Sequence, residues 1–215
     1  NNVMGSVMRF HKLQTLEKLS EEERKKLDDF IMQENEQEKS NLLSEGYIDL
    51  FDVWDAIYSG NEEIVSLIVR AGIDVNMHNG MLICDAVGNS KIVKMFIDAG
   101  ADITSECLIR YAAYYQLWDT AKVLIDAGAD VTVRNNLPLK YALSNKDTRG
   151  VSMLIDAGAR IQEEWPLEYL EAKDDFQIID SILSKDIESC DNKFNKIIAI
   201  IIRNLLKFKQ FCFKK

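Results

Sequence analysis

The chain has 215 residues, 47% of them hydrophobic, so it can bury a sizeable core and is not disordered as a whole. It contains only two prolines and ten glycines among many helix-forming residues, which predicts a mostly helical protein and argues against an all-β one. The formal net charge of −9 argues against non-specific binding to nucleic acid, because neutralising phosphates requires clustered Lys and Arg.

The N-terminal part of the chain lacks the long apolar region of a signal peptide, and the chain begins with Asn1 rather than Met. We therefore expect a trimmed or partial N-terminus. The charged stretch that follows opens with Ser20 and Glu23, at the spacing of a helix capping box. This spacing predicts a long charged helix within an N-terminal helical cap, residues 1–48, that shields the helices after it.

A six-residue segment recurs along the middle of the chain. Its glycines lie 28, 28 and 30 residues apart, which is too regular for chance. Each copy follows a stretch whose apolar residues recur at helical spacing, so each glycine is expected to cap a helix in the left-handed conformation. The copies are AGIDVN at 71–76, AGADIT at 99–104, AGADVT at 127–132 and AGARIQ at 157–162.

A small residue lies sixteen positions before each of these glycines, where it would let an earlier helix approach its neighbours closely. These residues are Ala56, Cys84, Ala112 and Ala142. Each repeat is therefore predicted to contain a short first helix, a tight turn, a longer second helix, a glycine cap and a loop.

This order of elements resembles the ankyrin repeat, whose pattern is TPLHxAAxxG, then an apolar helix, then GADVN. The closest copies are LPLKYAL at 137–143, YAA at 111–113 and the AGAD segments at 99–102 and 127–130. The resemblance covers residues 49–162 as four repeats and implies an all-α, ankyrin-type helical solenoid of stacked helix-turn-helix units. Because the period is shorter than the family's ~33 residues, we expect short loops in place of β-hairpin fingers. Short, degenerate arrays of this style are similar to those of large DNA viruses and intracellular bacteria.

The pattern weakens after the fourth repeat. Pro166 lies twenty-eight residues after Pro138, and we interpret residues 163–190 as a degenerate fifth repeat. Residues 191–215 are basic and strongly apolar, unlike the acidic remainder. We expect them to form a final capping helix, an amphipathic helix that binds a membrane surface or a partner, or a disordered tail. Their longest apolar run is far shorter than the ~20 residues that span a bilayer.

The sequence contains no legible catalytic or metal-binding motif. The repeated glycines are single caps rather than a GxGxxG or GxxxxGK cluster, and the Asp pairs lie in highly charged helical stretches. The four cysteines form no CxxC pair, and the two histidines are too far apart for an HExxH site. We predict no enzyme activity, no cofactor, no metal, and free thiols in a reducing compartment such as the cytoplasm, including that of a host cell.

The resemblance implies a noncatalytic module that binds a partner protein along the concave groove formed by its first helices and loops. With fingers shortened, the first helices should carry more of the contact than usual. Tyr114 and Tyr115 are favoured because Tyr is enriched among interface hot spots, although packing between repeats is the alternative for both. The predicted partner-binding residues are Trp54, Tyr58, His78, Arg110, Tyr114, Tyr115, Trp118, Arg134, Lys140 and Asn145.

Two ambiguities remain among these residues. Trp54, Arg110 and Lys140 stand where the family motif has His, so they either bond neighbouring loops or face the groove. Trp118 follows the helix turn and is either exposed on the same side or packed in the core. The expected assembly is a monomer with an unknown protein partner and no nucleic acid. The alternative function is a membrane-associated adaptor that uses residues 191–215.

Overall fold

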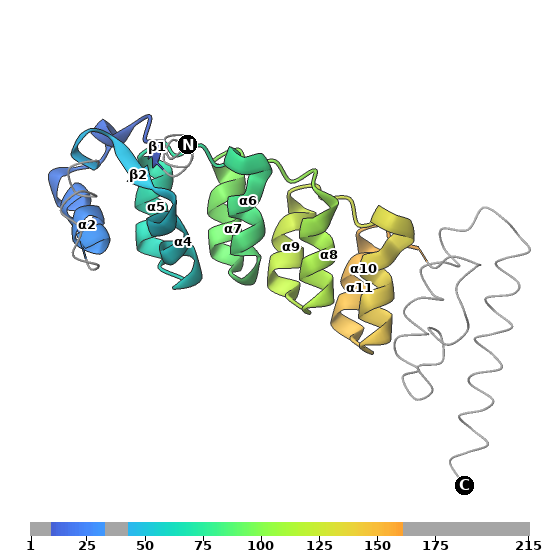
Figure 1. The fold of residues 1–215 in the computed structure, drawn as a ribbon. Helices are drawn as coiled ribbons and strands as arrows, with labels where there is room; N and C mark the ends of the chain where they lie inside the picture. Colours follow the sequence, from blue (N-terminus) through green and yellow to red (C-terminus); the bar gives the residue numbers. More distant parts are fainter. Residues whose placement is uncertain (1–9, 33–42, 161–215) are drawn as a thin grey trace, which may run out of the picture. The chain divides into compact units, whose positions relative to one another are not determined.

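The computed structural model describes residues 10–32 and 43–160 (Figure 1). The chain divides into two compact units, residues 1–108 and residues 109–215, called here unit 1 and unit 2. The predicted fifth repeat, residues 163–190, and the basic apolar segment, residues 191–215, lie outside the described residues.

Unit 1 opens with a small antiparallel ribbon that the sequence patterns did not predict. Strand β1 (Phe10–Lys12) pairs with β2 (Tyr47–Asp49), with Phe10 opposite Asp49 and Lys12 opposite Tyr47. Strands of three residues are too short to show the alternation by which strands are recognised. The short 3-10 helix η1 (Leu16–Lys18) and helix α2 (Glu21–Ile31) lie between them in the chain.

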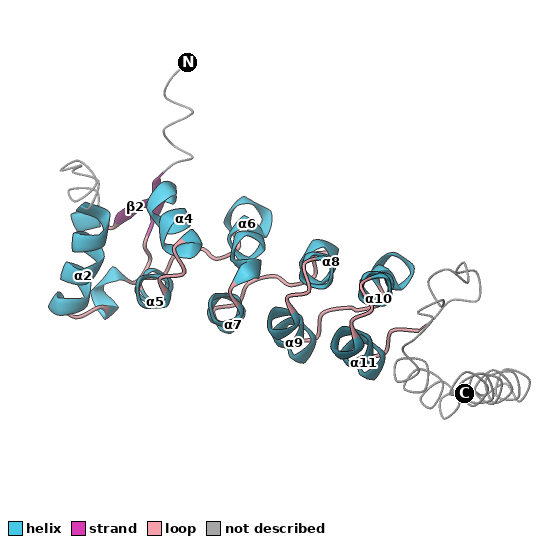
Figure 2. Cartoon of the chain, turned by 90° about the horizontal axis from the view of Figure 1, so that it is seen from below, coloured by secondary structure: helices cyan, strands magenta, loops and turns pink. Residues whose placement is uncertain are grey.

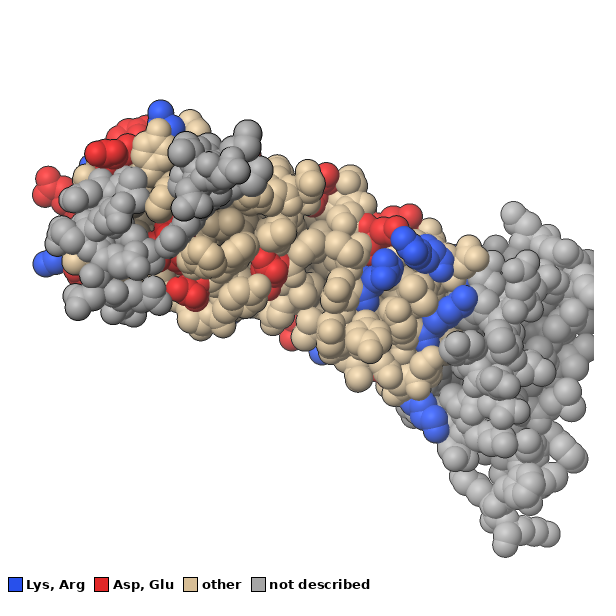
Figure 3. Space-filling model, viewed as in Figure 1, with Lys and Arg blue, Asp and Glu red and all other residues tan. Residues whose placement is uncertain are grey.

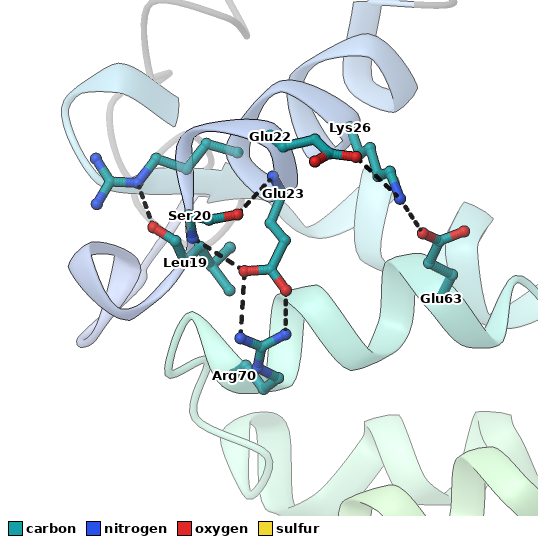
Figure 4. Close-up of polar contacts among 8 residues, drawn as sticks. Leu19, Ser20, Glu22, Glu23, Lys26, Glu63 and Arg70 are labelled. Atoms are coloured by element: carbon teal, nitrogen blue, oxygen red, sulfur yellow. Dashed lines mark hydrogen bonds and ion pairs between the residues drawn. The ribbon is translucent and has the colours of Figure 1, made fainter.

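The predicted capping box at the start of α2 is confirmed. The Ser20 hydroxyl accepts a hydrogen bond from the Glu23 amide at 3.2 Å, and the Glu23 carboxylate accepts one from the Ser20 amide at 2.9 Å. Figure 4 shows Arg70 reaching from α5 (Glu62–Arg70) to the same carboxylate, where its two terminal nitrogens lie 2.5 and 3.2 Å from the two oxygens. Lys26 of α2 pairs with Glu63 of α5 at 2.8 Å. These contacts join α2 to the second helix of the first repeat.

The segment after β1 covers the C-terminal end of α5. The Thr15 amide donates to the Ala71 carbonyl at 2.7 Å, and the Thr15 hydroxyl donates to the Arg70 carbonyl at 2.8 Å. Carbonyls at a helix end have no partner within the helix, so these bonds satisfy them. Gly72 permits this approach: its φ is +86°, and a Cβ there would lie 2.7 Å from the Thr15 hydroxyl oxygen.

Four helix pairs follow the N-terminal ribbon in the described residues. In each unit the first helices of the pairs lie in one row and the second helices in another (Figure 2). This arrangement and the short connections between the pairs confirm the predicted all-α repeat fold. The pairs are α4 (Leu50–Tyr58) with α5, α6 (Met77–Asp85) with α7 (Ser90–Asp98), α8 (Glu106–Tyr114) with α9 (Trp118–Asp126), and α10 (Val133–Ser144) with α11 (Thr148–Asp156); the 3-10 helix η3 (Ala86–Gly88) joins α6 to α7.

The cores of the pairs follow the apolar spacing of the sequence. In α7, Ile92, Val93 and Phe96 are buried, and all three fall on one face of the helix. Ala112 and Ala142, two of the small residues of the first helices, are completely buried. Small side chains at these positions therefore allow the close approach between helices that the sequence predicts.

The loops between repeats are built from aspartate turns rather than β-hairpin fingers. Asp74, Asp102 and Asp130 each accept a hydrogen bond from the amide two residues later, at 2.8 to 2.9 Å. This is the Asx turn, which Asp favours. Residues 50–160 contain no strand. The predicted short loops are thus confirmed.

Two of these loops continue into a left-handed turn in which three successive residues have positive φ. The turns are His78–Gly80 and Arg134–Asn136. Asn136 is 4% exposed, and its side-chain oxygen accepts a hydrogen bond from the Arg160 amide at 3.0 Å. Asn tolerates this conformation better than most residues, because its short polar side chain can form local hydrogen bonds.

Asn76 forms a related link between neighbouring repeats. Its side chain donates to the Gly100 carbonyl at 2.9 Å and accepts from the Asp102 amide at 2.7 Å. Asparagine side chains therefore tie one loop to the next within unit 1 and again within unit 2.

Candidate protein-binding surface

Four tyrosines of unit 2, from α8, the turn directly after it and α10, contact one another and are called here the tyrosine cluster. Tyr111 and Tyr115 stack with ring centroids 5.9 Å apart. Tyr114 meets Tyr115 at 4.9 Å and Tyr141 at 5.1 Å, both edge to face. Tyr111, Tyr114 and Tyr115 are 49%, 55% and 58% exposed, and Tyr141 is half-buried, so three of the four rings are open to solvent.

Helix geometry explains why these side chains gather. Tyr111 and Tyr115 are four residues apart, and the Tyr115 amide, directly after α8, donates to the Tyr111 carbonyl at 3.0 Å, so the two side chains lie on the same side. Ala112 and Ala113, on the other side of α8, are completely buried. The small residues face the core, and the tyrosines are turned toward solvent.

Tyr111 and Tyr141 were not among the predicted binding residues. Each directly precedes the small residue of its repeat, Ala112 or Ala142, so the two tyrosines occupy equivalent positions. Because equivalent positions of neighbouring first helices lie close together, this shared position could have identified Tyr111 and Tyr141 as members of the cluster from the sequence.

The first helices of the two units carry charges of opposite sign. Unit 1 has Asp52 and Asp55 in α4 and Asp85 in α6, and neither helix contains Lys or Arg. In unit 2, α10 and residues 109–114 of α8 include Arg110, Arg134 and Lys140 but no Asp or Glu, whereas Glu106 in the first turn of α8 belongs to unit 1. Figure 3 shows Lys and Arg gathered over the part of unit 2 that α10 occupies.

The other predicted residues of unit 2, except Trp118, lie in α8 and α10 or at the C-terminal end of α10. Arg134 and Asn145 are exposed, and Arg110 and Lys140 are half-buried. The Nε atom of Arg110 is itself buried and has no hydrogen-bond acceptor among the described residues. This guanidinium is therefore not bonded to a neighbouring loop through Nε.

Trp118 corrects the prediction, because it is only 5% exposed and cannot contact a partner. Its indole N–H donates to the Asp147 carboxylate, and its ring packs against Gly150 in α11. Asp147 also caps α11 by accepting from the Gly150 amide at 3.0 Å. Trp118 therefore belongs to the interface between α9 and α11.

The three predicted residues of unit 1 do not form a comparable cluster. Tyr58 is 68% exposed, and partial burial together with a hydrogen bond to Asp85 raises the pKa of its hydroxyl. His78 is exposed, and its ring meets that of His11 edge to face with centroids 5.2 Å apart. Trp54 is half-buried, and its ring meets that of Phe51 at 5.5 Å.

Unit 1 also brings two cysteines together. The sulfur atoms of Cys84 in α6 and Cys107 in α8 lie 3.4 Å apart, and the Ser105 hydroxyl lies 2.8 Å from the Cys107 sulfur. Burial and the neighbouring Cys107 raise the pKa of Cys84 to about 12. Both thiols are free.

Residues 10–32 and 43–160 lack two further features. No group of three or more His, Cys, Asp or Glu side chains is arranged to hold a metal ion in that part of the chain. Within the same residues, no helix is both long enough and apolar enough to cross a membrane.

These paired helices and aspartate-turn loops define a helical repeat protein whose exposed first helices form its most distinctive surface. Residues 80–164 match the family described as ankyrin repeats (3 copies), and this part of the chain is an array of ankyrin repeats. No curated protein and no solved structure matches the chain. Ankyrin repeats are general protein–protein interaction modules and are generally noncatalytic.

Proposed function

We propose that this chain is a noncatalytic interaction module that holds one partner protein on the first helices of unit 2. The tyrosine cluster is the observation that carries the proposal. Tyr is enriched among the few interface residues that dominate binding energy. Four contacting tyrosines, three of them exposed, form the kind of surface that monomeric proteins use for a partner.

The packing of the tyrosines favours this role further. Each ring in the cluster already contacts another ring, so its rotamers are restrained before any partner arrives. Binding then loses less side-chain entropy than it would with isolated, freely rotating side chains. The cluster is therefore partly preorganised.

Affinity capture from a lysate tests this proposal. The native chain is compared with the double variant Tyr114→Ala/Tyr115→Ala and with a control, Lys122→Ala/Asp126→Ala, which removes an exposed ion pair on the second helix α9. We expect a partner that is recovered with the native chain and the control but lost with the tyrosine variant. Equal recovery with all three proteins would show that the binding surface lies elsewhere.

The composition of residues 191–215 supports a second candidate, a membrane-associated adaptor. Basic residues flank a bulky apolar run there, as in helices that lie on anionic membranes. Sedimentation with anionic vesicles, with and without these residues, tests the idea. Unchanged sedimentation after truncation would exclude it.

A further inference from the structure

The two histidines of the chain are far apart in the sequence but meet in unit 1. His11 lies in β1, and His78 lies in the left-handed turn at the start of α6. Their Nε2 atoms are 3.4 Å apart across sixty-seven residues, and the planes of their rings are nearly perpendicular, at 86°. His78 is exposed and His11 is half-buried, so solvent reaches the pair.

The distance between the two nitrogens matches that of two ligands of one metal ion. Zinc binds imidazole nitrogen at about 2.0–2.1 Å with tetrahedral geometry, which places two such nitrogens about 3.3–3.4 Å apart. The observed separation of 3.4 Å falls at this value. It also exceeds the roughly 2.7–3.2 Å of ordinary N–H···O hydrogen bonds, so a direct hydrogen bond between the rings is a weak one. The spacing therefore suits a shared ion better than a direct bond.

The backbone holds both histidines in place. His11 lies opposite Ile48 in the antiparallel ribbon of β1 and β2. The turn that contains His78 is closed by a hydrogen bond from the Gly80 amide to the Asn76 carbonyl at 3.2 Å. Ligands that are positioned before the ion arrives lose little conformational entropy when it binds. The pair is thus a preformed two-ligand arrangement.

The chemistry of the donors selects a transition metal. Imidazole nitrogen suits Zn²⁺, Cu²⁺ and Ni²⁺, whereas Mg²⁺ and Ca²⁺ take oxygen ligands. A metal-bound imidazole keeps its second nitrogen for a hydrogen bond, so further contacts of either ring are compatible with the site. No third His, Cys, Asp or Glu joins the pair among the residues that the structure describes, and within that part of the chain the other positions of the ion are open to water.

We propose that His11 and His78 together bind one divalent transition-metal ion, zinc in the first place, through their Nε2 atoms. The ion joins β1 to the first helix of the second helix pair. The hydroxyl of Thr15 already fastens the same N-terminal segment to the Arg70 carbonyl at the end of α5, and the ion extends this attachment to the next repeat. The site lies in unit 1 and is independent of the proposed binding surface in unit 2.

Zinc titration of the untagged full chain tests the proposal. Isothermal titration calorimetry at micromolar concentrations, with millimolar Mg²⁺ present, should show one zinc ion bound per chain. Because the chain has only two histidines, NMR spectra of their imidazole nitrogens report on the site directly. Both imidazoles should shift together over the same range of zinc concentration. A shift of only one imidazole, or binding that requires millimolar zinc, would overturn the proposal.

Variants of the two ligands locate the ion. His11→Gln and His78→Asn each remove one imidazole, and Asn tolerates the positive φ of position 78. Each should weaken zinc binding by more than about tenfold, since even the partners behind a metal ligand contribute that much. Lys12→Gln, in the same strand as His11, is the control and should bind zinc as the native chain does. Unchanged binding by either histidine variant, or equal weakening by the control, would contradict the assignment.

A further variant separates this site from the cysteine pair of unit 1. Thiolates are also common zinc ligands, and the sulfurs of Cys84 and Cys107 lie 3.4 Å apart. Cys84→Ser/Cys107→Ser should bind zinc as the native chain does, and loss of binding would assign the ion to the thiols instead. Thermal melts with a chelator present verify that all variants remain folded.

Amide hydrogen exchange measures the structural consequence. Zinc should slow exchange in β1 and in the turn that contains His78 in the native chain but not in His11→Gln. Exchange that zinc leaves unchanged in the native chain would show that no ion joins these two segments.

Discussion

The indole ring of Trp118 lies against the backbone of Gly150, so closely that no other residue fits there. A Cβ at Gly150 would overlap Cζ2 and Cη2 of the ring and would lie 2.6 Å from Cε2. Gly150 does not have a positive φ, so the required feature is space rather than backbone conformation. The hydrogen bond from the indole to Asp147 holds the ring in this position.

Replacing Gly150 with Ala should therefore destabilise the chain, although Gly→Ala inside a helix normally stabilises by about 0.5–1 kcal/mol. We expect a loss of about 1–3 kcal/mol in the free energy of unfolding, the usual cost of overpacking. Urea denaturation measures it. Gly88→Ala is the matched control, because no atom lies within 4 Å of a Cβ there. A Gly150→Ala protein as stable as the control would refute the packing of Trp118.

The asparagine links between loops should differ in strength according to their burial. Asn136→Ala removes the acceptor for the Arg160 amide at a buried site and places Ala at a φ of 58°. We expect a loss of about 1–3 kcal/mol in the free energy of unfolding. Asn76→Ala removes two hydrogen bonds at an exposed site, where water replaces them, and should cost less.

A third variant, Asn136→Gly, separates the two contributions at this position. Glycine accepts positive φ without strain but makes no side-chain hydrogen bond. Its stability should fall between those of the native chain and Asn136→Ala. If Asn76→Ala were the more damaging change, burial would not govern these links.

Mild oxidation should join Cys84 to Cys107. Their sulfurs are 3.4 Å apart, and a disulfide requires about 2.05 Å, a small movement. With glutathione disulfide as oxidant, one thiolate attacks it and releases glutathione, and the second cysteine then displaces another glutathione. Because the raised pKa keeps Cys84 protonated at neutral pH, Cys107 should attack first.

Peptide mapping by mass spectrometry under non-reducing conditions detects this cross-link. We expect a linked peptide pair that has lost two hydrogens and that is absent from Cys107→Ser. In Cys84→Ser, Cys107 should instead accumulate as a mixed disulfide with glutathione. Pairing of either cysteine mainly with other cysteines of the chain would contradict the geometry.

The contact between Glu23 and Arg70 predicts a specific dependence of stability on pH. Hydrogen bonds from Arg70 and from the Ser20 amide lower the pKa of Glu23 from 4.5 to about 2. Since the folded pKa is below the unfolded one, the contribution to stability is complete above pH 4.5 and is lost as the pH falls toward 2.

Glu23→Gln should therefore unfold at a lower urea concentration than the native chain at pH 7, and the difference should disappear near pH 2. Glu21→Gln is the control, because Glu21 lies in the same first turn of α2. A difference for Glu23→Gln that persisted unchanged to pH 2 would show that charge pairing with Arg70 is not its cause.

The candidate surface was partly predictable from sequence. Tyr114 and Tyr115 were predicted to contact a partner, with packing between repeats as the alternative, and the structure exposes both. The sequence left open whether Trp118 is exposed or packed in the core, because the residues near it in the chain do not show what packs against its ring. Its burial depends on a glycine thirty-two residues later, whose missing side chain makes room for the ring.

The sequence by itself determined the features that arise among residues a few positions apart. These are the capping box of Ser20 and Glu23, the positive φ of the repeated glycines and the amphipathic second helices, all set by local hydrogen bonds and helical periodicity. Only the tertiary structure decided which distant residues meet. Thr15 bonds to Arg70 across fifty-five residues, and Trp118 to Asp147 across twenty-nine. The joining of Tyr111 and Tyr141 into one cluster likewise required the packing of one helix against the next, which no local pattern encodes.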